Sequence, residues 1–469
     1  MNPTDPHARL TRRETLSRIA CGFGGMAFSG MLTAEALGSP LSLRKPHFPA
    51  QAKRVIFLFL HGGVSHVDSF DPKPELARRH GQPLPIPKPD FEFADTGNLL
   101  QSPWNFSRYG ECGTQVSELF PKIGKCMDEI ALVRSMTNGK QVSHGPAALS
   151  LHTGDGVFMR PSLGAWTLYG LGVENRNLPG FIALSPSSYH GGAQNFGSAF
   201  LPAAYQGMRI GDGHTSFKDA KIPNLSPASP EARQRRLLNY LKIQNQRHLD
   251  RKTADGRLEA RLQSFELAFR MQMAAPRVFD LENETKPTRE LYGVGDKHTD
   301  EFGRQCLLAR RLAEAGVRFI QVNHSYPRNY WDAHGGLKGN HSSNAIKVDQ
   351  PIAGLLRDLK GRGMLDETLV VFGTEFGRTP AAQGGDGRDH HPHAFSMWLA
   401  GGGIRGGVVH GETDEFGYYV VRDEVNVHDL HATILHLLGL DHERLTYNYA
   451  GRNFRLTDVS GKVVRKILS

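Results

Sequence analysis

Cysteine is scarce in this chain of 469 residues, which contains only four. No two of them stand in a CxxC pair, and Cys21 lies in the N-terminal segment, so three remain for the rest of the chain: Cys112, Cys126 and Cys306. An odd number of cysteines gives no complete disulfide framework. Cys112 and Cys126 could pair in an oxidising compartment, but buried free thiols are the favoured interpretation.

Long apolar runs and blocks of one charge are also missing. The stretch between residues 19 and 32 is too short and too rich in glycine for a stable membrane span, and no later segment is apolar enough either. The net charge of +9 is spread thinly, without a Lys/Arg block beside stacking aromatic residues. Nucleic-acid binding is therefore not expected, whereas the weak basic excess favours acidic ligands or anionic surfaces.

The first forty residues have the features of an export leader. The run from Thr11 to Leu16, TRRETL, resembles a twin-arginine signal, a weakly apolar stretch follows it, and Ala34-x-Ala36 is a cleavage candidate. We therefore expect residues 1–36 to be a signal peptide and the protein to be periplasmic or secreted. A disordered basic tail is the alternative interpretation.

Six apolar segments predict strands: residues 55–60, 130–133, 181–184, 317–322, 368–372 and 395–399. Helical patterns separate several of them, including 300–315, capped by Asp300, and 352–359. This alternation predicts an α/β fold with a mostly parallel sheet covered by helices. A charged segment with apolar residues at helical spacing predicts a helical insertion, about residues 227–300, within a domain that spans residues 50–469.

Acidic residues and histidines follow the ends of two predicted strands. Glu375 comes just after the run 368–372, and Asp332, His334 and His341 follow the run 317–322. Open α/β sheets bind ligands at the carboxyl ends of their strands, so these side chains are expected to converge there. Carboxylate and imidazole groups ligate divalent cations, which favours a metal site over a polar loop capped by Asp332.

Two nearby segments add candidates. Adjacent residues of an extended chain face different directions, so at most one or two histidines of Asp389-His390-His391-Pro392-His393 can point inward. We expect His390 to do so, with Asp389 as a further ligand and the other two histidines at the surface or behind the ligands. Arg378 could pair with Glu375 or face an anionic substrate.

Several motifs resemble those of a known family: the runs from His61 to Pro74, Trp331 to His334, Gly373 to Pro380, Gly387 to Pro392 and Met397 to Gly403. They closely resemble those of exported, sulfatase-like bacterial proteins grouped as domain-of-unknown-function family 1501, and the likeness covers nearly the whole chain. That family is placed in the alkaline phosphatase superfamily, with phosphatases, arylsulfatases and cofactor-independent phosphoglycerate mutases. The resemblance implies a three-layer α/β/α sandwich with metals at the carboxyl edge of the sheet.

The resemblance also implies metal ligands. Glu375 matches the acidic ligand after a central strand, and His390 resembles the late histidine ligand. Asp332 and His334 stand where an aspartate and a histidine bind the other metal in the superfamily. That pattern leaves a helical turn between the two, whereas one residue intervenes here, so His341 is an alternative partner. The ions would be zinc, calcium, magnesium or manganese.

This chain departs from the superfamily at two other positions. After the first strand it has His61-Gly62-Gly63 in place of an aspartate, so either Asp68 substitutes or that metal site is altered. The segment from His144 to Gly154 is similar to the sulfatase signature, but His144 replaces the Cys or Ser and no formylglycine can form. A role for His144 as metal ligand or base is favoured over nucleophile; a nucleophilic Ser143 and a purely structural histidine are the alternatives.

The leading hypothesis is an exported, metal-dependent hydrolase of phosphate or sulfate esters, in which Arg378 offsets developing charge. Its substrate would be an anionic ester, with sulfated or phosphorylated carbohydrates as candidates. The alternative is a catalytically altered metal-binding surface or binding protein on the same fold, which the replacement at His144 favours. A mutase-like isomerase fits an exported chain poorly.

Overall fold

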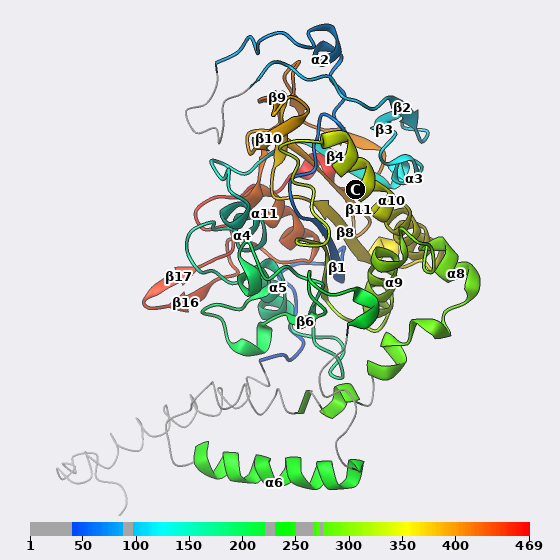
Figure 1. Cartoon of the computed structure of the whole chain (residues 1–469). Helices are drawn as coiled ribbons and strands as arrows, with labels where there is room; N and C mark the ends of the chain where they lie inside the picture. The colour runs from blue at the N-terminus through cyan, green and yellow to red at the C-terminus, as the bar shows by residue number, and fades with distance from the viewer. Residues whose placement is uncertain (1–39, 88–96, 221–229, 250–265, 268, 273–274) are drawn as a thin grey trace, which may run out of the picture. The chain divides into compact units, whose positions relative to one another are not determined.

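The computed structural model describes residues 40–87, 97–220, 230–249, 266–267, 269–272 and 275–469 (Figure 1). The chain divides into two units, residues 1–42 and 43–469, and the elements below all belong to the second. The predicted signal peptide and part of the predicted helical insertion lie outside the described residues. No helix in the described part is long and apolar enough to cross a membrane.

A nine-stranded sheet forms the centre of the second unit. Its order is β12-β4-β11-β8-β1-β7-β5-β6, with β15 beside β4. All neighbours are parallel except β11, which runs antiparallel to both β8 and β4. The mostly parallel sheet predicted from the sequence is therefore confirmed. The strands are β1 (Arg54–Leu60), β4 (Ile130–Thr137), β5 (Phe181–Leu184), β6 (Met208–Ile210), β7 (Phe319–His324), β8 (Thr368–Gly373), β11 (Phe395–Ala400), β12 (Val408–His410) and β15 (Val425–Asn426).

Helices and short two-stranded sheets complete this unit. The helices are α2 (Pro74–Arg78), α3 (Pro121–Gly124), α4 (His144–Thr153), α5 (Leu163–Leu171), α6 (Glu231–Leu249), α8 (Lys286–Leu291), α9 (Asp300–Glu314), α10 (Leu337–Gly361) and α11 (Val427–Leu437). The short pairs are β2 (Phe106–Tyr109) with β3 (Thr114–Ser117), β9 (Gly377–Gln383) with β10 (Gly387–His391), β13 (Glu412–Thr413) with β14 (Val420–Arg422), and β16 (Tyr447–Tyr449) with β17 (Arg452–Phe454).

Strand β1 shows why helices cover both faces of the sheet. Its sequence RVIFLFL is apolar from the second residue onward, and those residues are all buried, as a strand covered on two faces requires. Ile56 and Leu58 belong to a core cluster that includes residues of α9 and α10. On the other face, Phe57 and Phe59 contact the ring of His152 in α4. Helices α4, α5 and α11 lie on one side of the sheet and α9 and α10 on the other, which gives the expected three layers (Figure 1).

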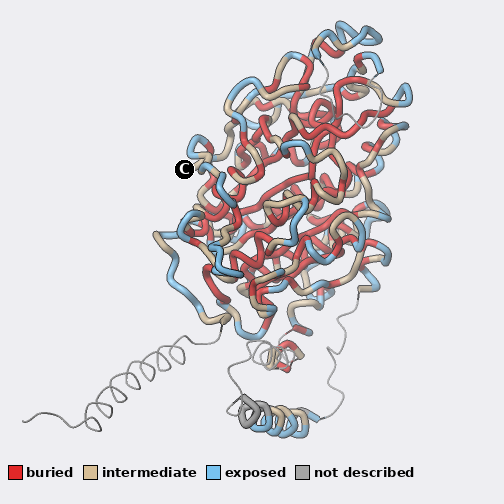
Figure 2. The backbone as a smooth tube through the Cα atoms, turned by 90° about the vertical axis from the view of Figure 1, so that its left-hand side faces the viewer, coloured by how far each residue is buried: buried red, intermediate tan, exposed pale blue. Residues whose placement is uncertain are grey.

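Buried residues gather around this sheet in the interior of the unit (Figure 2). The strand expected from residue 317 begins two residues later, because the N–H of Val317 still bonds to the carbonyl of Leu312 at the end of α9. The helix expected from residue 352 is much longer and begins at Leu337. It contains Pro351, and a proline usually marks the start of a helix rather than its interior.

Two smaller expectations also need correction. The N-cap of α9 is Thr299, and Asp300 is the first helical residue instead of the cap. The cysteines at 112, 126 and 306 are all free. Cys126 and Cys306 are buried, as expected, but Cys112 is exposed.

Candidate metal centre

Polar side chains converge at the carboxyl edge of the sheet. The last residues of neighbouring strands are in register there: Leu60 of β1 pairs with His324 of β7, and Phe59 with Gly373 of β8. The loops that follow these strands begin with His61 after β1 and include Glu375 after β8. Segments that are distant in sequence therefore reach one place because parallel strands end at the same edge.

Asp332, His334 and His390 form a compact triangle of donor atoms. Asp332 Oδ1 lies 3.1 Å from His334 Nε2 and 3.3 Å from His390 Nε2. The two imidazole nitrogens are 3.0 Å apart. Ligand atoms about 2.0 Å from a tetrahedral cation are about 3.3 Å from one another. The triangle thus has the size of one face of such a coordination shell.

The outer nitrogens of both imidazoles are held by acceptors. His390 Nδ1 donates to the carbonyl of Val142 at 2.6 Å, and His334 Nδ1 donates to Gln383 Oε1. Asp389 Oδ1 lies 3.6 Å from the same His334 nitrogen, so Asp389 stands behind the imidazole. These acceptors assign the proton of each ring to Nδ1, which leaves a lone pair on each Nε2. Both rings are therefore in the tautomer that a cation requires.

His144 directs a fourth acceptor toward the triangle. It is the first residue of α4, and its Nδ1 donates to Glu375 Oε1 at 2.7 Å. Its Nε2 lies 3.4 Å from Asp332 Oδ2 and is buried without a hydrogen-bond partner. The centroids of the His144 and His390 rings are 4.3 Å apart. Imidazole nitrogens and a carboxylate that converge in this way suit a divalent cation.

The charges of the surrounding groups agree with cation binding. Burial opposes ionisation of Glu375, yet the imidazoles of His61 and His144 lower its pKa to about 2. Burial likewise opposes the charge of Asp332, but the facing imidazoles of His144, His334 and His390 lower that pKa. Burial lowers the pKa of His390 to about 4, so this ring is neutral near pH 7. Burial opposes protonation of His144, but the carboxylates of Asp332 and Glu375 raise its pKa.

Arg378 has a different environment from the one expected. Its side chain is fully buried, and its donors contact the carbonyls of Gly62, Gly63 and Arg388. Its Nη2 also donates to Asp332 Oδ1 at 2.7 Å. Arg378 therefore neither pairs with Glu375 nor faces outward toward a substrate. The guanidinium fixes the orientation of the Asp332 carboxylate instead.

Asp68 and His341 do not join the triangle. Both oxygens of Asp68 accept from the guanidinium of Arg388, at 2.7 and 3.1 Å, and both side chains of this pair are fully buried. His341 lies within α10, and its Nε2 accepts from the N–H of Ser65 at 3.1 Å. Neither belongs to a group of potential ligand atoms within 4.8 Å of one another in the described part of the chain. The partner of Asp332 is thus His334 and not the alternative, His341, even though only one residue separates Asp332 from His334.

Two further histidines, His61 and His190, lie at the centre but were not predicted as metal ligands or catalytic residues. His61 is buried, and its Nε2 is 2.9 Å from His190 Nδ1. His190 follows β5 and has a left-handed backbone, with φ of 52°. The position of His61 directly after the first strand was a usable signal, whereas the glycine-rich loop around His190 indicated only that this residue could line the pocket. His391, in contrast, turns away from the centre and bonds to the carbonyl of Tyr418.

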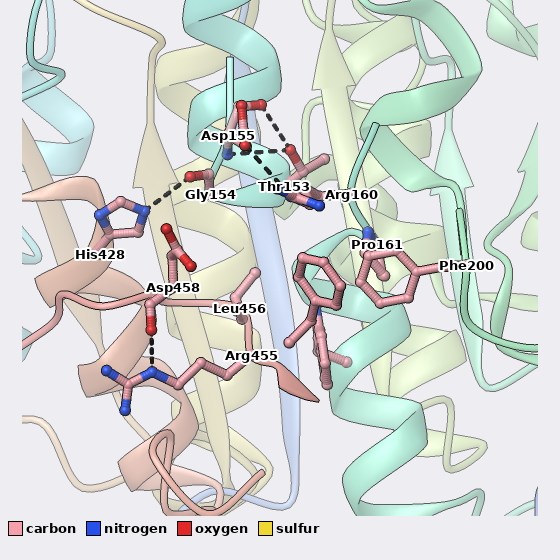
Figure 3. Close-up of a pocket in the computed structure, with 12 residues that line it drawn as sticks. Thr153, Gly154, Asp155, Arg160, Pro161, Phe200, His428, Arg455, Leu456 and Asp458 are labelled. Carbon is pink, nitrogen blue, oxygen red and sulfur yellow. Dashed lines mark hydrogen bonds and ion pairs between the residues drawn. The ribbon is translucent and has the colours of Figure 1, made fainter. Parts of the chain in front are cut away.

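A separate cavity of about 50 Å³ lies at the opposite end of α4 (Figure 3). Its lining includes Asp155, Arg160 and Asp458, but none of the residues of the metal centre. Arg160 pairs with Asp155 at 3.4 Å, so part of its charge is already balanced. This cavity is therefore distinct from the candidate centre.

Comparisons with known proteins place the chain in a family. No curated protein sequence matches it. Among solved structures, the lipoteichoic acid synthase LtaP from Listeria monocytogenes is 11% identical with a TM-score of 0.38, over 89% of this chain and 78% of that one. The PsFucS1 sulfatase from Pseudoalteromonas sp. is 12% identical with a TM-score of 0.36, over 85% and 69%. A mutant of TAB5 alkaline phosphatase with Mg bound in its M3 site is 12% identical with a TM-score of 0.36, over 85% and 99%. Residues 52–468 match the family described as "Protein of unknown function (DUF1501)", and this protein therefore belongs to the DUF1501 family.

Proposed function

We propose that this protein is a metal-dependent hydrolase of phosphate or sulfate esters. The observation that carries the proposal is the convergence of the Asp332 carboxylate with the Nε2 atoms of His144, His334 and His390, at distances of 3.1 to 3.4 Å. A divalent cation bound there would polarise the ester and lower the pKa of the attacking water. The twin-arginine-like N-terminus supports export of the enzyme to the periplasm or beyond.

Asp332, His334 and His390 would hold the cation, and the surrounding chain holds these ligands. Arg378 orients the carboxylate, while Val142 and Gln383 fix the two rings. Two imidazole nitrogens and one carboxylate oxygen suit zinc or manganese better than calcium or magnesium, which prefer oxygen donors. Three protein ligands also leave a coordination position open, as a catalytic site requires.

His144 and Glu375 would act together as the base. Glu375 accepts the Nδ1 proton of His144, which orients the ring and stabilises the charge that it acquires. The unpartnered Nε2 then accepts a proton from the attacking water. General base catalysis of this kind typically contributes about 10²- to 10⁴-fold in rate.

The substrate would be an anionic ester, and sulfated or phosphorylated carbohydrates are candidates. Helix α4 begins at His144, and the side chain of its cap residue Ser143 makes no capping hydrogen bond. N–H groups at a helix start bind anions, so this end of α4 favours a phosphate or sulfate group beside the cation. Because Arg378 is enclosed, the cation and this helix end would balance the charge of the ester.

The test combines metal analysis with activity on small aryl phosphates and aryl sulfates. We expect the wild type to bind metal and to hydrolyse one of these esters. Asp332→Ala should lose both properties, whereas His144→Asn should retain the metal and lose about 10²- to 10⁴-fold in kcat. Asp458→Ala, in the separate cavity, is the matched control and should change neither. Metal binding without turnover of either ester would instead support the alternative hypothesis, a catalytically altered metal-binding protein on the same fold.

A further inference from the structure

Resting on the proposed hydrolase function, we infer that the centre holds a single cation. An array of two hydrogen-bonded pairs, His190 with His61 and Glu375 with His144, occupies the place beside it where a second cation could otherwise bind. In this array His61 and His190 are positioning residues: His190 bonds to His61, the His61 ring lies 3.8 Å from Glu375 Oε1, and Glu375 accepts from His144. The array is defined by these four side chains.

Distances alone would allow a second cation. One ligand atom each of His61, His144 and Glu375 lie within 4.8 Å of one another. His61 Nε2 is 3.8 Å from Glu375 Oε1 and 2.9 Å from His190 Nδ1. Whether a cation fits depends on which of these atoms still has a free lone pair, because metal ligands must be free of protons.

Both oxygens of Glu375 are already engaged by donors of the protein. Its Oε1 accepts from the N–H of Gly62 at 2.9 Å and from His144 Nδ1 at 2.7 Å. Its Oε2 accepts from the same N–H at 3.1 Å and from Thr374 Oγ1 at 3.2 Å. Three donors thus share the carboxylate, which offers about four acceptor positions, and the one N–H of Gly62 spans both oxygens. The side chain is also fully buried, so it has no room to turn toward another ligand arrangement.

His61 presents a proton to the array rather than a lone pair. The N–H of Tyr326 donates to its Nδ1 at 3.4 Å. A neutral imidazole that accepts at Nδ1 carries its proton on Nε2, and this proton is directed to His190 Nδ1 at 2.9 Å. His61 Nε2 is thus a donor, in contrast to the Nε2 atoms of His334 and His390 in the metal triangle.

His190 is held in place for this contact. Its backbone has a φ of 52°, a conformation that residues other than glycine rarely adopt and that concentrates at functional sites. Asn195 Nδ2 donates to its carbonyl at 3.0 Å, and the ring of Tyr330 stacks on its imidazole with 15° between the planes. The strained backbone and the stacked ring both direct His190 toward His61.

The first measurement is the number of ions bound per chain at saturating zinc and at saturating manganese. We expect one ion in the wild type, none in Asp332→Ala, and one in His61→Ala and in His190→Ala, each with an affinity within about threefold of the wild type. The exposed His80 provides the control variant, His80→Ala. Thermal melting of every variant reports whether it folds.

The second measurement separates a positioning role from simple packing. His61→Ala and His190→Ala should lower kcat about 10-fold or more with little change in KM, because they loosen the base without touching the ester. His61→Gln should recover most of this loss, because its amide can donate from a similar position. The positioning role would be overturned if His61→Gln did not recover kcat, or if the two alanine variants kept the kcat of the wild type.

The outcomes also separate this inference from the proposed function. Two ions in the wild type, with one lost in His61→Ala or His190→Ala, would overturn the single-cation centre and leave the hydrolase standing. No bound ion in the wild type would overturn the hydrolase itself.

Discussion

Asp68→Asn tests whether Asp68 supports the fold or holds a metal. Both side chains of the Asp68–Arg388 pair are fully buried, and the guanidinium contacts the two carboxylate oxygens at 2.7 and 3.1 Å. Burial opposes the charge of Asp68, but Arg388 lowers its pKa. The substitution keeps the shape of the side chain and removes its charge, so it leaves Arg388 as a buried cation without a counter-ion.

Removing one partner of a buried ion pair typically destabilises a protein by about 3–5 kcal/mol. The value should lie near the lower end, because Arg388 also donates to the carbonyls of Thr379, Pro380 and Leu100. Unfolding entropy is about 2.1 cal/mol/K per residue, so the unit of residues 43–469 has an unfolding entropy of about 0.9 kcal/mol/K. The melting temperature should therefore fall by about 3–4 °C.

The assay is thermal unfolding in the presence of a chelator, together with the metal content of untreated protein. Asp68→Asn should lower the melting temperature and leave the metal content unchanged. The double variant with Arg388→Met removes the unpaired charge and should recover at least half of the lost stability. Loss of bound metal by Asp68→Asn, with no change in melting temperature under chelator, would show that Asp68 is a ligand and refute this reasoning.

Of three other predictions, two concern residues that support the centre and one concerns the cysteines. Gly62→Ala should lower cation affinity at least about 10-fold, measured by chelator competition. The added Cβ would lie 2.6 Å from the backbone N of Asp332, and the φ of Gly62 is 119°. The control is Gly295→Ala, which should leave the affinity unchanged because Gly295 has a similar φ of 93° but open space around it. Arg378→Lys should lower the affinity about 10- to 100-fold in the same assay, because lysine cannot reproduce the forked contacts that fix the carboxylate; full affinity would contradict this role. Of the three described cysteines, only Cys112 should react rapidly with a thiol reagent in the native protein, and fast reaction of all three would contradict the buried positions of the others.

The sheet could be predicted from the sequence because its strands are short apolar runs that a buried parallel sheet requires. The run in β1 is continuous and ends at His61, so both the strand and its exit were visible. The start of α10 was not, because Pro351 interrupts the helical pattern although the surrounding turns accommodate it. Propensity favoured a boundary there, and packing against α9 determined the real one.

The site could be predicted only in part. Strand order places residues from distant loops at one edge, so Asp332, Glu375 and His390 were expected together, and the structure brings them together. Sequence does not show which donor a carboxylate will meet. Asp68 was expected at the centre, but in the structure it pairs with the buried Arg388. Arg378 was expected to face a substrate, but its guanidinium donates to backbone carbonyls that enclose it. Those outcomes depend on side-chain packing.

The position of β1 at the middle of the sheet has a consequence for the timing of assembly. This strand emerges early in synthesis, but its neighbours β7 and β8 follow much later, and the contact between Gly62 and Glu375 joins residues 313 positions apart. Contacts of such long range form slowly and cannot form before the ribosome has made most of the chain. Cation loading must therefore wait until translation is almost finished, and a nascent chain truncated before β8 should hold no metal.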